Sequence, residues 1–124
     1  MTGITTRGLY VCAAAMGGSA AYPTYTAIGM GSTAFTSGDT ALVEEFDRNI
    51  IDTYDFTTAE QITYISNWSP TEISGCILAE VGVMNSGLGG AMSSRNVLAG
   101  SLNFDGESEL QIQQTYKFYI TTDV

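Results

Sequence analysis

Alternating apolar and polar positions define the last part of the chain. In "ELQIQQTYKFYITT" (109–122) the apolar side chains fall on even-numbered positions, namely Leu110, Ile112, Tyr116, Phe118 and Ile120. Gln114 interrupts this series, and the odd-numbered positions from 111 to 121 carry glutamine, threonine, lysine and one tyrosine. Successive side chains of a β-strand point to opposite faces, so a period of two predicts a strand with one buried face.

Two further segments have strand-like patterns. In "QITYISNW" (61–68) Ile62, Tyr64 and Trp68 alternate with polar residues, and Ser66 is the exception. The segment "ISGCILAEVGVM" (73–84) is a nearly continuous apolar run that contains two glycines. Such a run predicts a strand that is buried on both faces, or one that bends at a bulge.

The segments between these strands have the composition of turns. "NWSPTE" (67–72) contains Pro70, which bars a helix, "NSGLGGA" (85–91) contains three glycines, and "DGESE" (105–109) is acidic. "RNVLAGSLNF" (95–104) is another strand candidate. Short strands joined by such turns predict a mainly β protein, with an antiparallel β-sandwich or barrel-like domain over 23–124.

Helix is expected only near the N-terminus and in one later segment. Residues 1–22 are predicted to contain a short helix, because Ile4, Leu9, Val11, Cys12 and Met16 give an amphipathic pattern over 4–16. A cleaved signal peptide is the less favoured interpretation of this region, since its apolar run is short and only one positive charge precedes it. The segment "GDTALVEEF" (38–46) has a helix-like pattern with Asp39 as its N-cap. Nothing suggests a second domain, so 1–124 is interpreted as one β-rich domain.

The residue composition and the net charge indicate which kinds of binding partner this chain can have. The 124 residues are 44% hydrophobic and only 14% charged, with a net charge of −9, so the surface must be covered largely by uncharged polar residues. Interfaces are depleted in charge at their centres, and this composition therefore favours a chain that packs against copies of itself. The four cations are scattered: Arg7, Arg48, Arg95 and Lys117. They cannot neutralise a row of phosphates or an anionic membrane, which argues against nucleic-acid and membrane partners.

The glycine-rich segment "IGMGSTAFTSG" (28–38) raises the question of a nucleotide site. It has a G-x-G but no Lys-Ser or Lys-Thr pair, so it is not a Walker loop. Ala34 stands where a dinucleotide fingerprint has its third glycine, but no crossover helix of adequate length follows. We therefore expect a connector without a bound phosphate.

Catalytic and metal chemistry find little support. The chain has no histidine, which excludes Ser-His-Asp and Cys-His sites. Its carboxylate pairs, Glu44 with Glu45 and Asp52 with Asp55, lie in or beside polar segments where solvated surface is the default. A calcium site from Asp39, Glu44 or Asp47 stays open, although these residues lack the spacing of a known loop. No cofactor and no enzymatic activity are expected.

The two cysteines, Cys12 and Cys76, lack the spacing of a zinc site. Two buried thiols are the favoured interpretation, and a disulfide between them stays open because the sequence cannot show whether their Cβ atoms meet.

Glu80 is the one charged residue inside the apolar run "CILAEVGVM". A lone buried carboxylate costs several kcal/mol unless it is paired or hydrogen-bonded. Arg95 and Arg48 are the available partners. We expect a structural ion pair between Glu80 and Arg95 that fixes strand register, in preference to a catalytic role.

Three segments together resemble a known family. "YTAIGMGSTAFTSGDTALVEEFDR" (25–48), "LAEVGVMNSGLGGAMSSRNVL" (78–98) and "ELQIQQTYKFYI" (109–120) are similar, in order and spacing, to segments of virion structural proteins of tailed phages or archaeal tailed viruses. These are tail-fibre, tail-collar or baseplate-associated proteins. "GMG" stands where "GTG" is commoner, and 49–72 matches no segment of the family.

The resemblance implies a non-enzymatic subunit of a tail fibre, collar, baseplate or head decoration. It would form a homo-oligomer, a trimer or a hexameric ring, and dock to other virion proteins. Its location would be the virion, assembled in the host cytoplasm. Two alternatives have the same β-rich polar composition. One is a secreted filament subunit or adhesin, and the other is a carbohydrate-binding module in which Trp68, Tyr64 and Tyr54 offer stacking faces.

Overall fold

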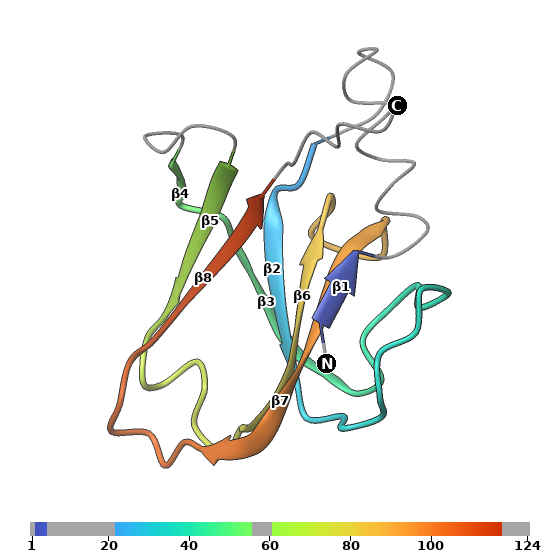
Figure 1. Cartoon of the computed structure of the whole chain (residues 1–124). Helices are drawn as coiled ribbons and strands as arrows, with labels where there is room; N and C mark the ends of the chain where they lie inside the picture. Colours follow the sequence, from blue (N-terminus) through green and yellow to red (C-terminus); the bar gives the residue numbers. More distant parts are fainter. Residues whose placement is uncertain (1, 5–21, 56–60, 118–124) are drawn as a thin grey trace, which may run out of the picture.

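The computed structural model describes residues 2–4, 22–55 and 61–117. Every regular element in these residues is a β-strand (Figure 1). The strands are β1 (Thr2–Ile4), β2 (Tyr25–Gly29), β3 (Glu45–Ile50), β4 (Thr53–Asp55), β5 (Gln61–Trp68), β6 (Ile77–Met84), β7 (Met92–Asn103) and β8 (Leu110–Lys117). They form two antiparallel sheets: a large sheet in the order β1-β7-β6-β2-β3 and a small sheet in the order β4-β5-β8. The mainly β prediction is confirmed.

The two sheets pack face to face around a shared core. Trp68 of the small sheet lies in one cluster with Ile28 and Val81 of the large sheet. A second cluster joins Tyr64 and Tyr116 of the small sheet to Val83 of the large one, and to Ile51 between β3 and β4. In the described residues the sheets share no strand, so the arrangement is that of a sandwich and not of a closed barrel.

The two residues that broke the strand alternation prove to face the core. Ser66 and Gln114 are both buried, in phase with their apolar neighbours. The Ser66 hydroxyl lies 2.9 Å from Thr26 Oγ1 and 2.9 Å from the carbonyl oxygen of Ile50, across the sandwich. Gln114 Oε1 accepts a hydrogen bond from Asn96 Nδ2 at 2.7 Å. Each of these two polar residues thus forms a hydrogen bond between the sheets. For the described residues, the prediction of which face of β5 and β8 is buried is confirmed.

Strand β6 is buried on both faces, as its apolar run predicts, and it lies between β7 and β2. Val81 and Val83 face the small sheet. Met84 packs on the opposite face against Leu42, which belongs to the segment between β2 and β3. The register between β6 and β7 shifts between Leu78 and Glu80 and again between Val83 and Met84, and shifts of this kind occur at β-bulges and other strand irregularities.

The helix expected over 38–46 is wrong. Asp39 and the residues up to Glu44 have no helical structure, and β3 begins at Glu45. Ile4, the first residue of the expected N-terminal amphipathic helix, lies in the short strand β1, and 5–21 lie outside the described residues. No helix in the described residues is long and apolar enough to span a membrane.

Candidate functional site

The Glu80 carboxylate is the centre of the most polar cluster in the interior. Its side chain is completely buried on β6 and faces the segment that connects β2 to β3, which we call the 30–44 loop. Glu80 Oε2 accepts hydrogen bonds from the backbone N–H groups of Gly31 (2.9 Å) and Glu44 (2.7 Å). Oε1 accepts one from the backbone N–H of Val43 (2.9 Å). One side chain therefore holds both ends of the loop against the large sheet.

Arg95, on the neighbouring strand β7, completes this cluster. Its guanidinium is fully buried, and Nε lies 2.9 Å from Glu80 Oε1. Nη1 lies 3.1 Å from Asp39 Oδ2, and Nη2 donates to the carbonyl oxygen of Thr33 at 2.8 Å. Both of these partners belong to the 30–44 loop. We call Glu80, Arg95, Asp39 and the three N–H groups the Glu80 hub.

Arg48, the other candidate partner of Glu80, has a different role. Its guanidinium pairs with Glu45 on the same strand at 2.7 Å. It also donates to the carbonyl oxygens of Ser86 and Gly89, each at 2.8 Å. Arg48 therefore holds the turn between β6 and β7 against the edge strand β3, and the structure brings Glu80 together with Arg95 alone.

The hub stabilises its carboxylates in the charged form. Burial alone would raise the pKa of Glu80, but hydrogen bonds from the Glu44 and Val43 N–H groups, from Arg95 and from the Gly31 N–H together hold that pKa below its ordinary value. Burial likewise opposes ionisation of Asp39, and hydrogen bonds from Thr36 and Arg95 outweigh it and lower the pKa. In the described residues every buried side-chain nitrogen or oxygen has a hydrogen-bond partner. The hub is thus a satisfied hydrogen-bond network in which both carboxyl groups favour the charged form.

The lowered pKa of Glu80 makes stability depend on pH with a definite sign. A carboxylate whose pKa is depressed by folding stabilises the protein above its unfolded pKa, about 4.3 for glutamate, and this contribution disappears as pH falls through the lower folded value. We expect the melting temperature to fall on acidification below about pH 5. Glu80→Gln, which cannot ionise, should have a lower melting temperature at neutral pH, and its melting temperature should change less with pH. Thermal denaturation across pH tests this, with the exposed Glu107→Gln as control, and parallel profiles for wild type and Glu80→Gln would contradict it.

The G-x-G at positions 29–31 is explained by close approach to Glu80. A Cβ atom on Gly29 would lie 2.6 Å from Glu80 Oε2, and one on Gly31 would lie 2.7 Å from the same oxygen. Real Cβ atoms do not approach other atoms so closely, so both positions require glycine. The N–H groups of Gly31, Val43 and Glu44 already bind an internal carboxylate. They are therefore not available to a phosphate, and the loop is built as a docked connector.

Gly31→Ala should destabilise the protein by about 1–3 kcal/mol, the usual cost of overpacking. Its new methyl group would lie 2.5 Å from the Cβ atom of Val43 as well as against Glu80, and neither neighbour can yield without breaking a hub hydrogen bond. Gly38→Ala is the matched control, because a Cβ atom there meets nothing within 4 Å. Urea denaturation of the two variants should show a lowered midpoint for Gly31→Ala only. Equal midpoints would mean that the loop repacks freely.

Two of the three carboxylates considered for calcium are bound to other side chains. Asp39 binds Arg95 in the hub, and Asp47 accepts a hydrogen bond from Trp68 Nε1 at 3.1 Å. Glu44 contributes its backbone N–H to Glu80. No three His, Cys, Asp or Glu side chains in the described part of the chain are grouped to hold a metal ion. The calcium site proposed from these residues is not assembled there.

The remaining pairs of carboxylates and cysteines give no reactive group. Glu45 is bound to Arg48, and Asp52 Oδ2 accepts a hydrogen bond from Asn67 Nδ2 at 2.9 Å. Cys76 is a free, buried thiol, and burial, together with the negative charge of Asp47, raises its pKa. This keeps it in the weakly nucleophilic thiol form. Cys12 lies outside the described residues.

The aromatic residues considered for carbohydrate stacking are mostly core residues. Trp68 is 2% exposed and Tyr64 is also buried, so neither presents a ring face to solvent. Tyr54 is half-buried, packs edge-on against Tyr64 with ring centroids 5.6 Å apart, and donates its hydroxyl proton to the carbonyl oxygen of Pro23 at 2.7 Å.

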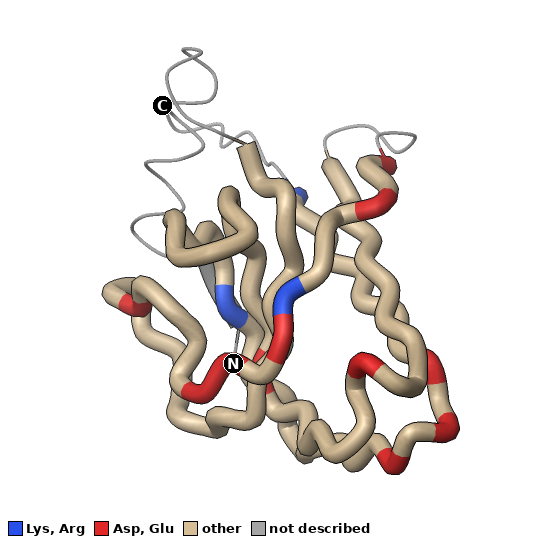
Figure 2. Tube along the Cα trace, turned by 180° about the vertical axis from the view of Figure 1, so that it is seen from behind, with Lys and Arg blue, Asp and Glu red and all other residues tan. Residues whose placement is uncertain are grey.

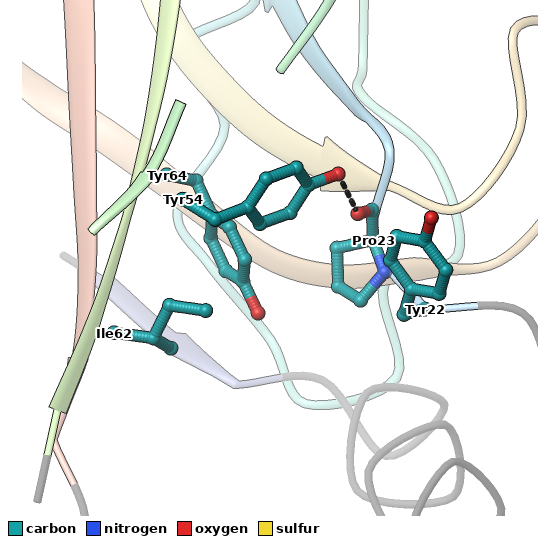
Figure 3. A pocket seen from close by; sticks show the side chains of 5 residues that line it. All are labelled: Tyr22, Pro23, Tyr54, Ile62 and Tyr64. Carbon is teal, nitrogen blue, oxygen red and sulfur yellow. Dashed lines mark hydrogen bonds between the residues drawn. The ribbon is translucent and has the colours of Figure 1, made fainter. Parts of the chain in front are cut away.

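A cavity of about 420 Å³ lies beside these rings (Figure 3). It is lined by Tyr22, Pro23, Tyr54, Ile62 and Tyr64. Tyr22 is 62% exposed at its rim. The cavity has the chemistry to accept an apolar group, and it offers few of the converging polar groups that orient a sugar. Sequence reasoning missed the contribution of Tyr22, Pro23 and Ile62, because only the fold brings them beside Tyr54.

Neither a scan against models of known protein families nor a search of curated proteins gives a match for this chain.

Proposed function

We propose that this chain is a non-enzymatic structural subunit of a virus particle, which assembles with copies of itself and docks to other virion proteins. The outer face of β5 and β8 is the observation on which the proposal rests. It carries a row of joined uncharged side chains: Thr63 with Thr115 (2.8 Å), Asn67 with Gln111 (3.0 Å), and Gln111 with Gln113 (2.8 Å). Such a surface can be buried against another chain without desolvating an unpaired charge.

The distribution of charge supports the same proposal. Apart from the buried Glu80 on β6, the acidic residues of the described part of the chain lie on the connecting segments and along β3 and β4, whereas β5 has no charged residue and β8 has only Lys117 (Figure 2). Several large apolar side chains are also solvent-exposed in the isolated chain: Tyr22, Val43, Ile50, Ile77, Leu88 and Leu102. Leu88, at the tip of the turn between β6 and β7, is 90% exposed on a loop that Arg48 holds in place. Apolar side chains on ordered elements are suited to contacts with neighbouring subunits.

The charged residues of the interior support a role without chemistry. Glu80 and Arg95 are both fully buried, and their hydrogen bonds hold the 30–44 loop. Together with the resemblance of 25–48, 78–98 and 109–120 to tail-fibre, collar and baseplate-associated proteins, this favours a subunit of the virion assembled in the host cytoplasm. The oligomer would be a trimer or a hexameric ring, without nucleic-acid or membrane partners.

Assembly of the purified protein tests the proposal. Sedimentation velocity over a hundredfold range of concentration, with electron microscopy of the same sample, should show a discrete oligomer. A monomer that persists at the highest concentration and has no affinity for other virion proteins would overturn the proposal.

The same uncharged strand surface would serve a secreted filament subunit or adhesin, which requires export. Mass spectrometry of the N-terminus of the protein made in its natural cell distinguishes the two. An intact Met1 or Thr2 end supports the virion subunit, and cleavage after a leader supports export.

A further inference from the structure

The four sheet edges of the described residues differ in how they are protected against pairing with another chain. Edge strands are normally blunted by shortness, charge, proline or bulges. The edges β1 and β4 have three residues each, and β3 carries Glu45, Asp47 and Arg48. The edge strand β8 has eight residues, pairs with β5 in unbroken register, contains no proline and has one charge, at its last residue Lys117. Of these four edge strands, β8 alone has none of the protective features (shortness, charge, proline or a bulge) over most of its length.

We propose that β8 is the self-assembly edge of this protein, and that it pairs antiparallel with β8 of a second copy about a two-fold axis at Gln113. The proposal rests on the proposed function, which it deepens by naming the contact. The small sheets of the two copies would then form one continuous six-stranded sheet. Backbone hydrogen bonds would supply the attraction, as in other cases of strand addition.

The sequence of β8 is complementary to itself in this register. With Gln113 opposite its own copy, Gln111 meets Thr115 and Ile112 meets Gln114, so that outward-facing residues meet outward-facing ones and inward-facing residues meet inward-facing ones. Glu109, the exposed residue just before the strand, comes opposite Lys117. The one charge of the strand is thereby matched by an opposite charge at each end of the contact.

Glu109 and Lys117 cannot form this pair within one chain. They stand at opposite ends of an extended strand with a rise of about 3.3 Å per residue, so they are separated by about two and a half times the Debye length of about 10 Å at moderate salt. Any electrostatic coupling between them must therefore act between copies. A second β8 supplies both charges in the right order, which favours a second copy of this chain as the occupant. An isologous contact of this kind does not close a trimer or a six-fold ring by itself; within the proposed function it would join two trimers into a hexamer with two-fold axes.

Charge exchange tests the pairing. Lys117→Glu and Glu109→Lys each place like charges opposite one another at both ends of the contact, and each should weaken self-association about tenfold or more. The double variant restores both pairs in reversed order and should regain wild-type association. Glu107→Lys, an exposed substitution outside the strand with the same charge change as Glu109→Lys, is the net-charge control for that variant. Sedimentation equilibrium at low salt measures all four.

Cysteine cross-linking tests the register. Gln113→Cys should form a disulfide between two copies on mild oxidation, because directly opposite residues bring their Cβ atoms close enough. Gln111→Cys alone should not form a homotypic cross-link, whereas Gln111→Cys combined with Thr115→Cys should. Peptide mass spectrometry identifies the bonded positions and separates them from Cys12 and Cys76. All three positions are exposed, so the variants should melt like the wild type.

The outcomes separate the two proposals. An oligomer that is insensitive to the charge exchange and gives no cross-link at position 113 would overturn the β8 contact and leave the structural role standing. A protein that stays monomeric at all concentrations would overturn the β8 contact, and one that in addition has no affinity for other virion proteins would overturn the structural role as well. Cross-linking at 113, with rescue by the double charge exchange, would support both.

Discussion

Glu80→Ala is expected to lower the free energy of unfolding by about 3–5 kcal/mol, the usual cost of removing one partner of a buried ion pair. The change removes the acceptor for the N–H groups of Gly31, Val43 and Glu44, and it leaves the fully buried guanidinium of Arg95 with Asp39 as its remaining carboxylate partner. Because whole domains are stable by only about 5–15 kcal/mol, this loss is a large fraction of the total. Urea denaturation followed by tryptophan fluorescence measures it.

A double-mutant cycle with Arg95→Ala shows whether the residues act as one unit. Each single change should be severe, and the double variant should be much less destabilised than the sum of the two, since no charge is then left buried and unpaired. Glu107→Ala, in the exposed turn before β8, is the control and should change the midpoint little. A wild-type midpoint for Glu80→Ala would show that the loop does not depend on this carboxylate.

Trp68→Ala is expected to cost about 3–5 kcal/mol, in the range observed for large aromatic truncations in cores. Trp68 is the largest fully buried side chain, and it packs between the sheets against Ile28 and Val81. Its indole nitrogen also donates to Asp47 on β3. Circular dichroism during thermal denaturation measures the loss.

Trp68→Phe separates the two contributions. It keeps most of the apolar volume and removes only the hydrogen bond to Asp47, so it should cost much less than Trp68→Ala. If Trp68 were instead a stacking surface for a carbohydrate, Trp68→Ala would leave the melting temperature unchanged and abolish binding on a glycan array.

The strands with a clear period could be read from the sequence. The alternation of apolar and polar residues shows which face of β5 and β8 is buried, and the apolar run of β6 shows that both of its faces are buried. Ser66 and Gln114 looked like defects in the pattern because a sequence shows polarity and not the partner. Thr26 and Asn96, the partners that satisfy them, lie on the opposite sheet.

The segment around Asp39 could not be read from the sequence. "TALVEE" has good helix formers after a good N-cap residue, which is a sound local signal. The structure overrides it because the N–H groups of Val43 and Glu44 bind Glu80, and Asp39 binds Arg95. A helix would use these backbone groups internally. Long-range partners decided the conformation, and their positions are set only when the sheet has formed.

The sequence predicts only part of the candidate site, because most of the partners of Glu80 are distant along the chain. A lone glutamate in an apolar run needs a partner, and the chain has few cationic residues. The sequence was therefore enough to infer that Glu80 pairs with Arg95. The three backbone donors carry no signature in the sequence. The glycines at 29 and 31 were noticed as a motif, but the interpretation as a close approach to a carboxylate needed the fold.

The composition of the Glu80 hub also bears on the order of folding events. Its donors come from residues 31, 43, 44 and 95, which are far from Glu80 along the chain, so the cluster can close only after β6 and β7 have paired. Until then the carboxylate keeps its hydration, and the connector stays undocked. We therefore expect substitutions in the hub to accelerate unfolding far more than they slow refolding, as measured by stopped-flow chevron plots. In that case the cluster forms after the folding transition state and slows unfolding of the native protein, and it is not part of the folding nucleus.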